Sequence, residues 1–244
     1  IRILFFVIIS YRNPIVNIFA KNTETLGMNK KFYPLLIAVL MLTALAVYTG
    51  VRTARAQSTF SFAEEKKIYL TFDDGPTPGV TEWILSTLRR YNAKATFFVL
   101  GKNVEMYPDL YQKILAEGHK VGNHTYSHQK GWGMSLERYL EDVDFAGDFI
   151  HSELFRPPYA RVTPSQMRAV AQKYKIVMWD IVSRDYNRSL SPEKCLKSVT
   201  DHITAGSIVV FHDSEKAFKN MSYALPRTLK YVQQLGLKCK IIEL

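Results

Sequence analysis

The sequence predicts a single α/β domain built on a parallel sheet, and three observations lead to that fold class. From Lys66 onward, short apolar segments typical of strands alternate with amphipathic segments typical of helices. About seven such units follow one another in about 180 residues, which suits either a small irregular barrel or an open doubly wound sheet. No internal repeat or long linker divides them. The 47% hydrophobic and 22% charged residues lie in the globular range, which excludes disordered and collagen-like chains.

The first half of this domain contains three expected strands, each followed by a helix. The strands are KIYLTF at 67–72, ATFFVL at 95–100 and a short segment at 120–123. The first helix, 80–91, has one apolar face, formed by Trp83, Ile84, Leu88 and Tyr91. The second, 106–117, ends at Gly118, a residue common just after helices. The third covers 135–150.

The second half continues the alternation to the end of the chain. A helix is expected at 163–173, because Thr163 is a typical N-cap and Pro164 suits the first turn. It is followed by a strand at 175–179, a helix at 192–204 and the apolar strand SIVVF at 207–211. A helix at 225–235 and a strand at 238–243 complete the expected elements.

The first 56 residues do not resemble a folded domain. Met28 is followed by two lysines, an apolar run at 35–47 and Ala54-Arg55-Ala56, which is the layout of a secretory leader. The run is shorter than the roughly 20 residues of a membrane span, although 32–51 would nearly reach. We therefore expect residues 28–56 to be a signal peptide or an N-terminal anchor. Residues 1–27 are expected to be a non-native upstream segment. The protein would be exported, to lie in the periplasm, outside the cell or at the outer face of the cytoplasmic membrane.

The positive charge of the chain is concentrated in this leading part. The whole sequence has 32 Lys+Arg and 22 Asp+Glu, a net charge of +10. Seven of these basic residues and one acidic residue lie in 1–56, so the rest of the chain carries a net charge of only +4. It contains no Lys/Arg run interleaved with aromatic residues, which argues against a nucleic-acid partner.

Ionisable residues follow five of the expected strands or buried segments. They are Asp73-Asp74 after 67–72, His124 after 120–123, Arg156 after Phe155, Asp185 after 175–179 and His212-Asp213 after 207–211. In parallel α/β folds the carboxyl ends of the strands share one side of the sheet, and that side carries the chemistry. We therefore expect these groups to lie near one another.

The acid pair and the histidine pair suggest a metal site. Asp73 and Asp74 could form an ordinary acidic turn, but one of them could also bind a cation while the other serves as a base. His124 and His128 are four residues apart, one helical turn, so both could reach a single ion; the alternative is two surface histidines. Together with Asp74 they would supply two nitrogens and one oxygen. That set leaves open positions on the metal, as in catalytic sites.

The remaining polar candidates have ordinary structural interpretations as well. In Arg156-Pro157-Pro158-Tyr159 the prolines stiffen a loop that could hold the guanidinium and expose a backbone N–H, or the segment could be a plain turn. His212 follows four apolar residues, so a half-buried core histidine is its default interpretation.

Five further residues have no partners at ligand spacing. His119, His151 and His202 are expected at the surface. Cys195 and Cys239 could form a disulfide in an exported protein, but their spacing does not decide it.

Five segments, taken in order, resemble the motif series of the polysaccharide deacetylases, carbohydrate esterase family four. They are TFDDGP (71–76), HTYSH (124–128), RPPY (156–159), SRDY (183–186) and IVVFHD (208–213). The family includes chitin, chitooligosaccharide and peptidoglycan deacetylases and acetylxylan esterases. The resemblance extends from about Lys67 to the end of the chain. It implies a distorted (β/α) barrel of about seven parallel strands, with residues 57–244 as the catalytic domain.

The resemblance also implies a metal centre and its base. Asp74, His124 and His128 would hold a divalent metal with an activatable water, zinc first and cobalt, nickel or manganese as alternatives. Asp73 would be the general base. Arg156 would orient Asp73 and keep it ionised.

The same resemblance assigns the acid and the substrate contacts. His212 would be the general acid, and Asp185 would raise its pKa and fix its tautomer. The fourth motif here has Tyr186 where the family usually has Trp, which makes one wall of the groove smaller. The substrate-binding residues would be Tyr159 through its backbone N–H, Val210 at the acetyl methyl, Tyr186 and Pro158.

We therefore expect a metal-dependent deacetylase that hydrolyses N-acetyl groups of N-acetylglucosamine residues, in peptidoglycan first or in chitin-type oligomers. Two alternatives are an O-acetyl esterase acting on xylan and a non-catalytic glycan-binding module. The expected partner is an N-acetylated glycan and not nucleic acid. The protein is expected to be a monomer, with 32–51 as a candidate membrane anchor.

Overall fold

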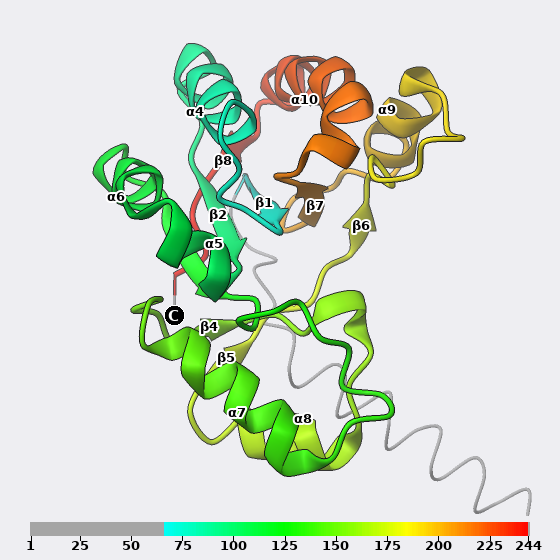
Figure 1. The fold of residues 1–244 in the computed structure, drawn as a ribbon. Helices are drawn as coiled ribbons and strands as arrows, with labels where there is room; N and C mark the ends of the chain where they lie inside the picture. Colours follow the sequence, from blue (N-terminus) through cyan, green and yellow to red (C-terminus); the bar gives the residue numbers. More distant parts are fainter. Residues whose placement is uncertain (1–65, 244) are drawn as a thin grey trace, which may run out of the picture. The chain divides into compact units, whose positions relative to one another are not determined.

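The computed structural model describes residues 66–243, which form a parallel α/β fold (Figure 1). The strands are β1 (Lys67–Asp73), β2 (Ala95–Val99), β3 (Lys120–Asn123), β4 (Leu154–Phe155), β5 (Lys175–Ile176), β6 (Ile181–Val182), β7 (Ile208–His212) and β8 (Lys238–Cys239). Seven of them follow the order β5-β4-β3-β2-β1-β7-β6, and β8 pairs with the beginning of β1. Every pairing is parallel.

The sheet is a distorted and incompletely closed barrel, which confirms the expected fold class. Its two end strands, β5 and β6, are neighbours along the chain, but no ladder joins them within residues 66–243. The helices surround the strands (Figure 1). They are α4 (Val80–Arg90), α5 (Gly101–Met106), α6 (Pro108–Ala116), α7 (Leu136–Gly147), α8 (Pro164–Val170), α9 (Pro192–Thr200) and α10 (Glu215–Gln234).

The central strand β1 separates an apolar face from a polar one. Ile68, Leu70 and Phe72 are fully buried in the main core cluster, and the Phe72 ring stacks on Phe97 of β2 at 5.0 Å. The alternate side chains belong to the other face, because successive residues of a strand point to opposite sides. That face carries Thr71 and Asp73, both buried. β1 therefore brings polar groups into the barrel interior.

Pairing with β1 sets the height of the neighbouring strands. Asp73 is level with His212 of β7 on one side and with Phe98 of β2 on the other. Asn123 at the end of β3 is level with Val99 and Phe155. The carboxyl ends of these strands consequently lie on one side of the sheet, as the sequence predicted.

Several predicted elements differ from those in the structure. The strand expected at 175–179 is only Lys175–Ile176, and β4, β6 and α5 were not predicted, because elements of two to six residues show no clear periodicity. The last helix begins at Glu215, ten residues before the predicted start, and continues through Pro226. From the sequence, Pro226 resembles a first-turn proline, which explains the misplaced start.

The predictions for residues 1–27, 28–56 and 32–51 fall outside the described part of the chain. Among the helices of residues 66–243, none is long and apolar enough to cross a membrane.

Candidate active site

The two adjacent acids at the end of β1 face different partners. Asp73 is the last residue of β1, and its Oδ1 accepts a hydrogen bond from Arg156 Nη1 at 2.7 Å. Asp74 adopts a positive φ of 81°, a conformation that Asp tolerates better than most residues. Its backbone is held by two hydrogen bonds, from its own N–H to Phe98 O and from Asn103 Nδ2 to its carbonyl. The turn thus separates the two carboxylates.

Asp74, His124 and His128 meet at one point. Their ligand atoms all lie within 4.8 Å of one another. Oδ1 of Asp74 is 3.1 Å from His128 Nε2 and 3.7 Å from His124 Nε2. His124 Nδ1 lies 2.7 Å from the carbonyl oxygen of Arg156. Since a carbonyl only accepts, Nδ1 carries the hydrogen, and the lone pair of Nε2 is left for a ligand.

This arrangement fits a divalent metal. Oδ1 of Asp74 is buried and accepts no hydrogen bond from any described residue, an expensive state unless a cation or water occupies the position. Burial lowers the pKa of His124 and so favours the neutral imidazole that a metal needs. Two nitrogens and one oxygen leave positions for water or substrate.

The histidine segment is a loop, and the helical turn expected for it is wrong. No helix covers residues 124–128, and Thr125 and His128 both have positive φ values, 68° and 61°. Hydrogen bonds within the segment maintain this shape. Asn123 Oδ1 accepts from the Thr125 N–H, and Thr125 Oγ1 accepts from the His128 N–H. The two imidazoles converge through loop geometry, not through helical spacing.

Arg156 is fully buried in the barrel interior, and all three nitrogens of its guanidinium donate hydrogen bonds. Nη1 donates to Asp73 and to the Thr71 hydroxyl, each at 2.7 Å, while Nε and Nη2 donate to the carbonyls of Val177 and Met178. The guanidinium carbon lies 4.0 Å from the centre of the Phe98 ring. A buried guanidinium with a hydrogen bond from each of its three nitrogens is a fixed positive charge beside Asp73.

His212 and Asp185 form a second buried pair. His212 Nδ1 is 2.7 Å from Asp185 Oδ1, and the His212 N–H donates to Oδ2 at 2.8 Å. Asn220 of α10 donates to the Asp185 carbonyl. Burial alone would lower the pKa of His212, but the charge and hydrogen bond of Asp185, together with the charges of Asp74 and Asp73, outweigh it and raise the pKa to about 9. Asp185 follows β6 and not the segment 175–179, which corrects the strand predicted to precede it.

Asp213, whose carboxyl group is buried, contacts the turn that begins at Asp73. Its N–H donates to the Asp73 carbonyl at 2.7 Å, and its Oδ2 accepts from the Thr81 hydroxyl at 2.6 Å. A Cβ on Gly75 would lie only 2.1 Å from that oxygen, so glycine is required there. Burial raises the pKa of Asp213 to about 8.

These groups surround a cavity of about 500 Å³ at the carboxyl ends of the strands. The residues lining it are Asp73, Asp74, His124, His128, Tyr159, Arg161, Trp179, Val182, Tyr186, Val210, His212, Ser214 and Lys216.

Three of the four expected substrate contacts line this cavity, namely Tyr159, Val210 and Tyr186. Pro158 is buried and is not among the lining residues. The ring of Tyr159 packs 4.7 Å from that of His128, and its N–H donates to no described residue. That N–H is therefore available to a ligand.

Sequence reasoning missed several residues of the site. Thr71 carries a usable signal, because it lies two residues before Asp73 and so on the same face of a buried strand. Trp179, Arg161 and Lys216 line the cavity, but no spacing in the sequence marks them.

The prediction for His119 is wrong. This residue is buried, its Nδ1 accepts from the Ala95 N–H at 3.2 Å, and burial lowers its pKa to about 4, so it is a neutral core histidine. His151 and His202 are exposed, as expected. Cys195 and Cys239 are free and buried.

The comparisons with known proteins agree with this architecture. Residues 62–179 match the family model described as polysaccharide deacetylase. A peptidoglycan-N-acetylglucosamine deacetylase from Bacillus cereus is 32% identical over 180 residues, which cover 70% of this chain and 84% of the relative. The chain belongs to the polysaccharide deacetylase family, which confirms the resemblance seen in the motifs.

Two further similarities refine this assignment. A peptidoglycan-N-acetylglucosamine deacetylase from Listeria monocytogenes is 36% identical over 189 residues, covering 73% of this chain but only 38% of the relative. The chain therefore spans well under half of that protein. A crystal structure of a peptidoglycan N-acetylglucosamine deacetylase matches with a TM-score of 0.68 and 28% identity, over 73% of this chain and 87% of that one.

Proposed function

We propose that this protein is a metal-dependent deacetylase that hydrolyses N-acetyl groups of N-acetylglucosamine residues in peptidoglycan. One observation carries the proposal. A single cavity brings together a two-histidine, one-carboxylate set, a carboxylate paired with a buried arginine, and a histidine paired with a buried aspartate. These groups supply an electrophile site, a base and an acid.

The base is Asp73. A divalent ion held by Asp74, His124 and His128 would polarise the acetyl carbonyl and lower the pKa of a water in its open position. Asp73 accepts the proton of the water that attacks that carbonyl. Arg156 positions this carboxylate by its 2.7 Å hydrogen bond and leaves Oδ2, the other oxygen, available for the proton.

The acid is His212. Its Nδ1 is occupied by Asp185, so Nε2 is the nitrogen that donates a proton to the leaving amine. A pKa raised to about 9 keeps His212 protonated at neutral pH. The free N–H of Tyr159 donates to the oxygen that becomes negative in the transition state. Val210 contributes the apolar surface expected beside an acetyl methyl.

The choice of peptidoglycan rests on the relatives and on the mouth of the cavity. The lining includes one arginine and one lysine, Arg161 and Lys216, which are exposed and form no ion pair within residues 66–243. Arg161 lies 5.7 Å from the ring of Trp132, and Lys216 lies 5.8 Å from that of Tyr186. Aromatic surfaces beside positive charges suit a glycan that carries carboxylates, as peptidoglycan does.

Zinc is the metal we propose, because histidine and carboxylate ligands in an open set are typical of catalytic zinc. Export follows from this function, since peptidoglycan lies outside the cytoplasmic membrane. We propose that residues 28–56 direct it, as a cleaved signal peptide or as an anchor through 32–51, and that the protein acts as a monomer.

The test is an acetate-release assay on three substrates, with protein stripped by a chelator and then given zinc. We expect acetate from peptidoglycan and, more slowly, from chitooligosaccharides, and only after zinc is restored. Release from acetylxylan alone would identify an O-acetyl esterase. Binding to glycans without acetate release from any substrate would indicate a glycan-binding module and refute the proposal.

A further inference from the structure

The loop that carries His128 is held by contacts with neighbouring helices in addition to its own hydrogen bonds. Its first part is tied to helix α5, because the N–H groups of Gly101 and Lys102 donate to the carbonyls of Thr125 and Tyr126. Residues 126–128 are themselves in neither a strand nor a helix. A ligand that follows such a segment is placed accurately only if the backbone just before it is fixed.

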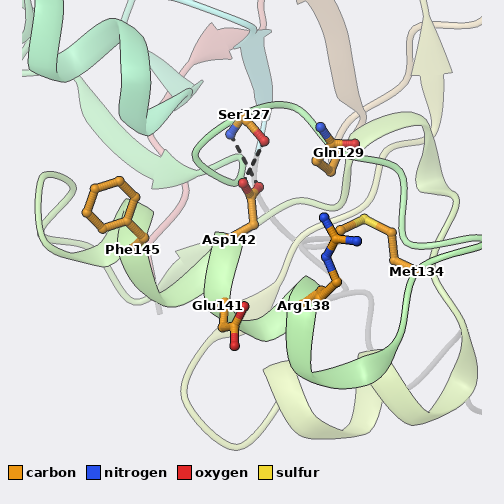
Figure 2. A pocket seen from close by; sticks show the side chains of 7 residues that line it. All are labelled: Ser127, Gln129, Met134, Arg138, Glu141, Asp142 and Phe145. Atoms are coloured by element: carbon orange, nitrogen blue, oxygen red, sulfur yellow. Dashed lines mark hydrogen bonds between the residues drawn. The ribbon is translucent and has the colours of Figure 1, made fainter.

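Asp142 of helix α7 supplies that support (Figure 2). Its Oδ1 accepts from the Ser127 hydroxyl at 2.6 Å, and its Oδ2 accepts from the Ser127 N–H at 3.2 Å. Its carbonyl accepts from the Tyr126 N–H at 3.1 Å. One aspartate thus binds the two residues that immediately precede His128. Hydrogen bonds to an ionised acceptor are stronger than neutral ones.

We infer that Asp142 is a positioning residue for the metal site, which sets metal affinity by holding Ser127 and thereby His128. It does not touch the ion, since it lies among the residues of a surface groove that contains no metal ligand: Ser127, Gln129, Met134, Arg138, Glu141, Asp142 and Phe145. This inference rests on the proposed function, because it requires that the site bind a metal.

The neighbouring Glu141 provides a matched control. It has the same charge and lies on the same helix, but it is exposed, and Figure 2 shows its carboxylate directed away from Ser127. If the negative charge of α7 acted through its field alone, removing Glu141 would change metal affinity as removing Asp142 does. If Asp142 acts through its hydrogen bonds to Ser127, only the removal of Asp142 should change metal affinity.

The experiment measures the zinc dissociation constant of the full chain by competition with a fluorescent chelator, for the wild type, Asp142→Ala, Ser127→Ala and Glu141→Ala. We expect Asp142→Ala to bind zinc about 10-fold more weakly and Ser127→Ala to change in the same direction, because a supporting residue commonly contributes 10-fold or more. Glu141→Ala should equal the wild type. Acetate release by Asp142→Ala should recover at saturating zinc, and its melting temperature in EDTA should match that of Glu141→Ala.

The outcomes separate this inference from the function it rests on. A wild-type protein that binds no zinc would refute the metal site and the inference together. A wild type that binds zinc, with Asp142→Ala within about twofold of it, would refute the inference alone. If Asp142→Ala does not fold, Ser127→Ala decides: weaker binding supports the inference, and unchanged binding overturns it.

Discussion

Replacing Asp185 with Asn should move the alkaline limit of activity to lower pH. The substitution keeps the size of the side chain but removes the negative charge that lies 2.7 Å from His212 Nδ1. That charge is the main influence that raises the pKa of His212, and burial is the main influence that lowers it. Without the charge, burial prevails, and His212 loses its proton at lower pH.

The size of the shift follows from the same interactions. The pKa of His212 is raised from its ordinary value of 6.5 to about 9 in the native protein. In Asp185→Asn it should fall to the ordinary value or below, a change of at least about 2 units. At any pH well above both pKa values, a separation of at least about 2 units lowers the protonated fraction, and with it the rate, by at least about 100-fold. A bound dication would lower the pKa of His212 in both proteins, so the prediction concerns the difference between the two pKa values.

The assay is kcat/KM for acetate release between pH 5 and pH 10 at saturating zinc, with Asp201→Asn, an exposed position, as control. We expect the alkaline limb of Asp185→Asn to lie at least about 2 pH units below that of the wild type, with activity recovering as the pH falls. If both proteins share one alkaline limb, His212 does not act as the acid through its pairing with Asp185.

Three further predictions concern other parts of the site. Arg156→Leu leaves a buried carboxylate without its partner, so urea denaturation should show a free energy of unfolding lower by about 3–5 kcal/mol; a loss under about 1 kcal/mol would contradict the account of this pair. The double variant Arg161→Ser with Lys216→Ser should raise KM for peptidoglycan at low salt but leave KM for neutral chitooligosaccharides unchanged. At high salt its KM for peptidoglycan should equal that of the wild type. An equal rise in KM for both substrates would exclude a role of these residues in charge recognition. Gly75→Ala places a Cβ 2.1 Å from Asp213 Oδ2 and should lower the free energy of unfolding by about 1–3 kcal/mol. Asp213→Ala should partly relieve this loss in a double mutant. If the two losses of stability simply add, the clash is not the cause.

The fold class and the grouping of the site were predictable for one reason. Parallel strands place their carboxyl ends on one side, so polar residues after apolar strands must lie together. Asp73 and His212, 139 positions apart, are level with each other on adjacent strands. Such long-range proximity follows from the order of strands and helices without any knowledge of side-chain contacts.

Local geometry was less predictable. His124 and His128 were identified as a ligand pair, but their spacing was explained by a helix that does not exist. The turns in this loop depend on Asn123 and Thr125, whose side chains bond to the backbone. Such bonds compete with helix formation, and periodicity does not reveal which conformation prevails.

Some residues act through contacts with segments far away in the sequence, and these residues could not be found from the sequence at all. In the sequence, Asp142 resembles any acidic residue on a helix. Its proposed positioning role depends on how close α7 lies to the loop that carries Ser127 and His128. His119 was misjudged for a similar reason. It has no acidic or ligand-spaced neighbour in the sequence and was therefore expected at the surface, but its Nδ1 accepts a hydrogen bond from the Ala95 N–H.

The most direct test of the account compares the wild type with Asp73→Asn in acetate release from peptidoglycan, after chelation and again after one equivalent of zinc. Asp73 is the proposed base but not a metal ligand, so both proteins should bind zinc. We expect zinc to restore acetate release in the wild type, while Asp73→Asn stays slower by about 10²–10⁴-fold. Acetate release by the zinc-free wild type, or equal rates for the two zinc-loaded proteins, would contradict it.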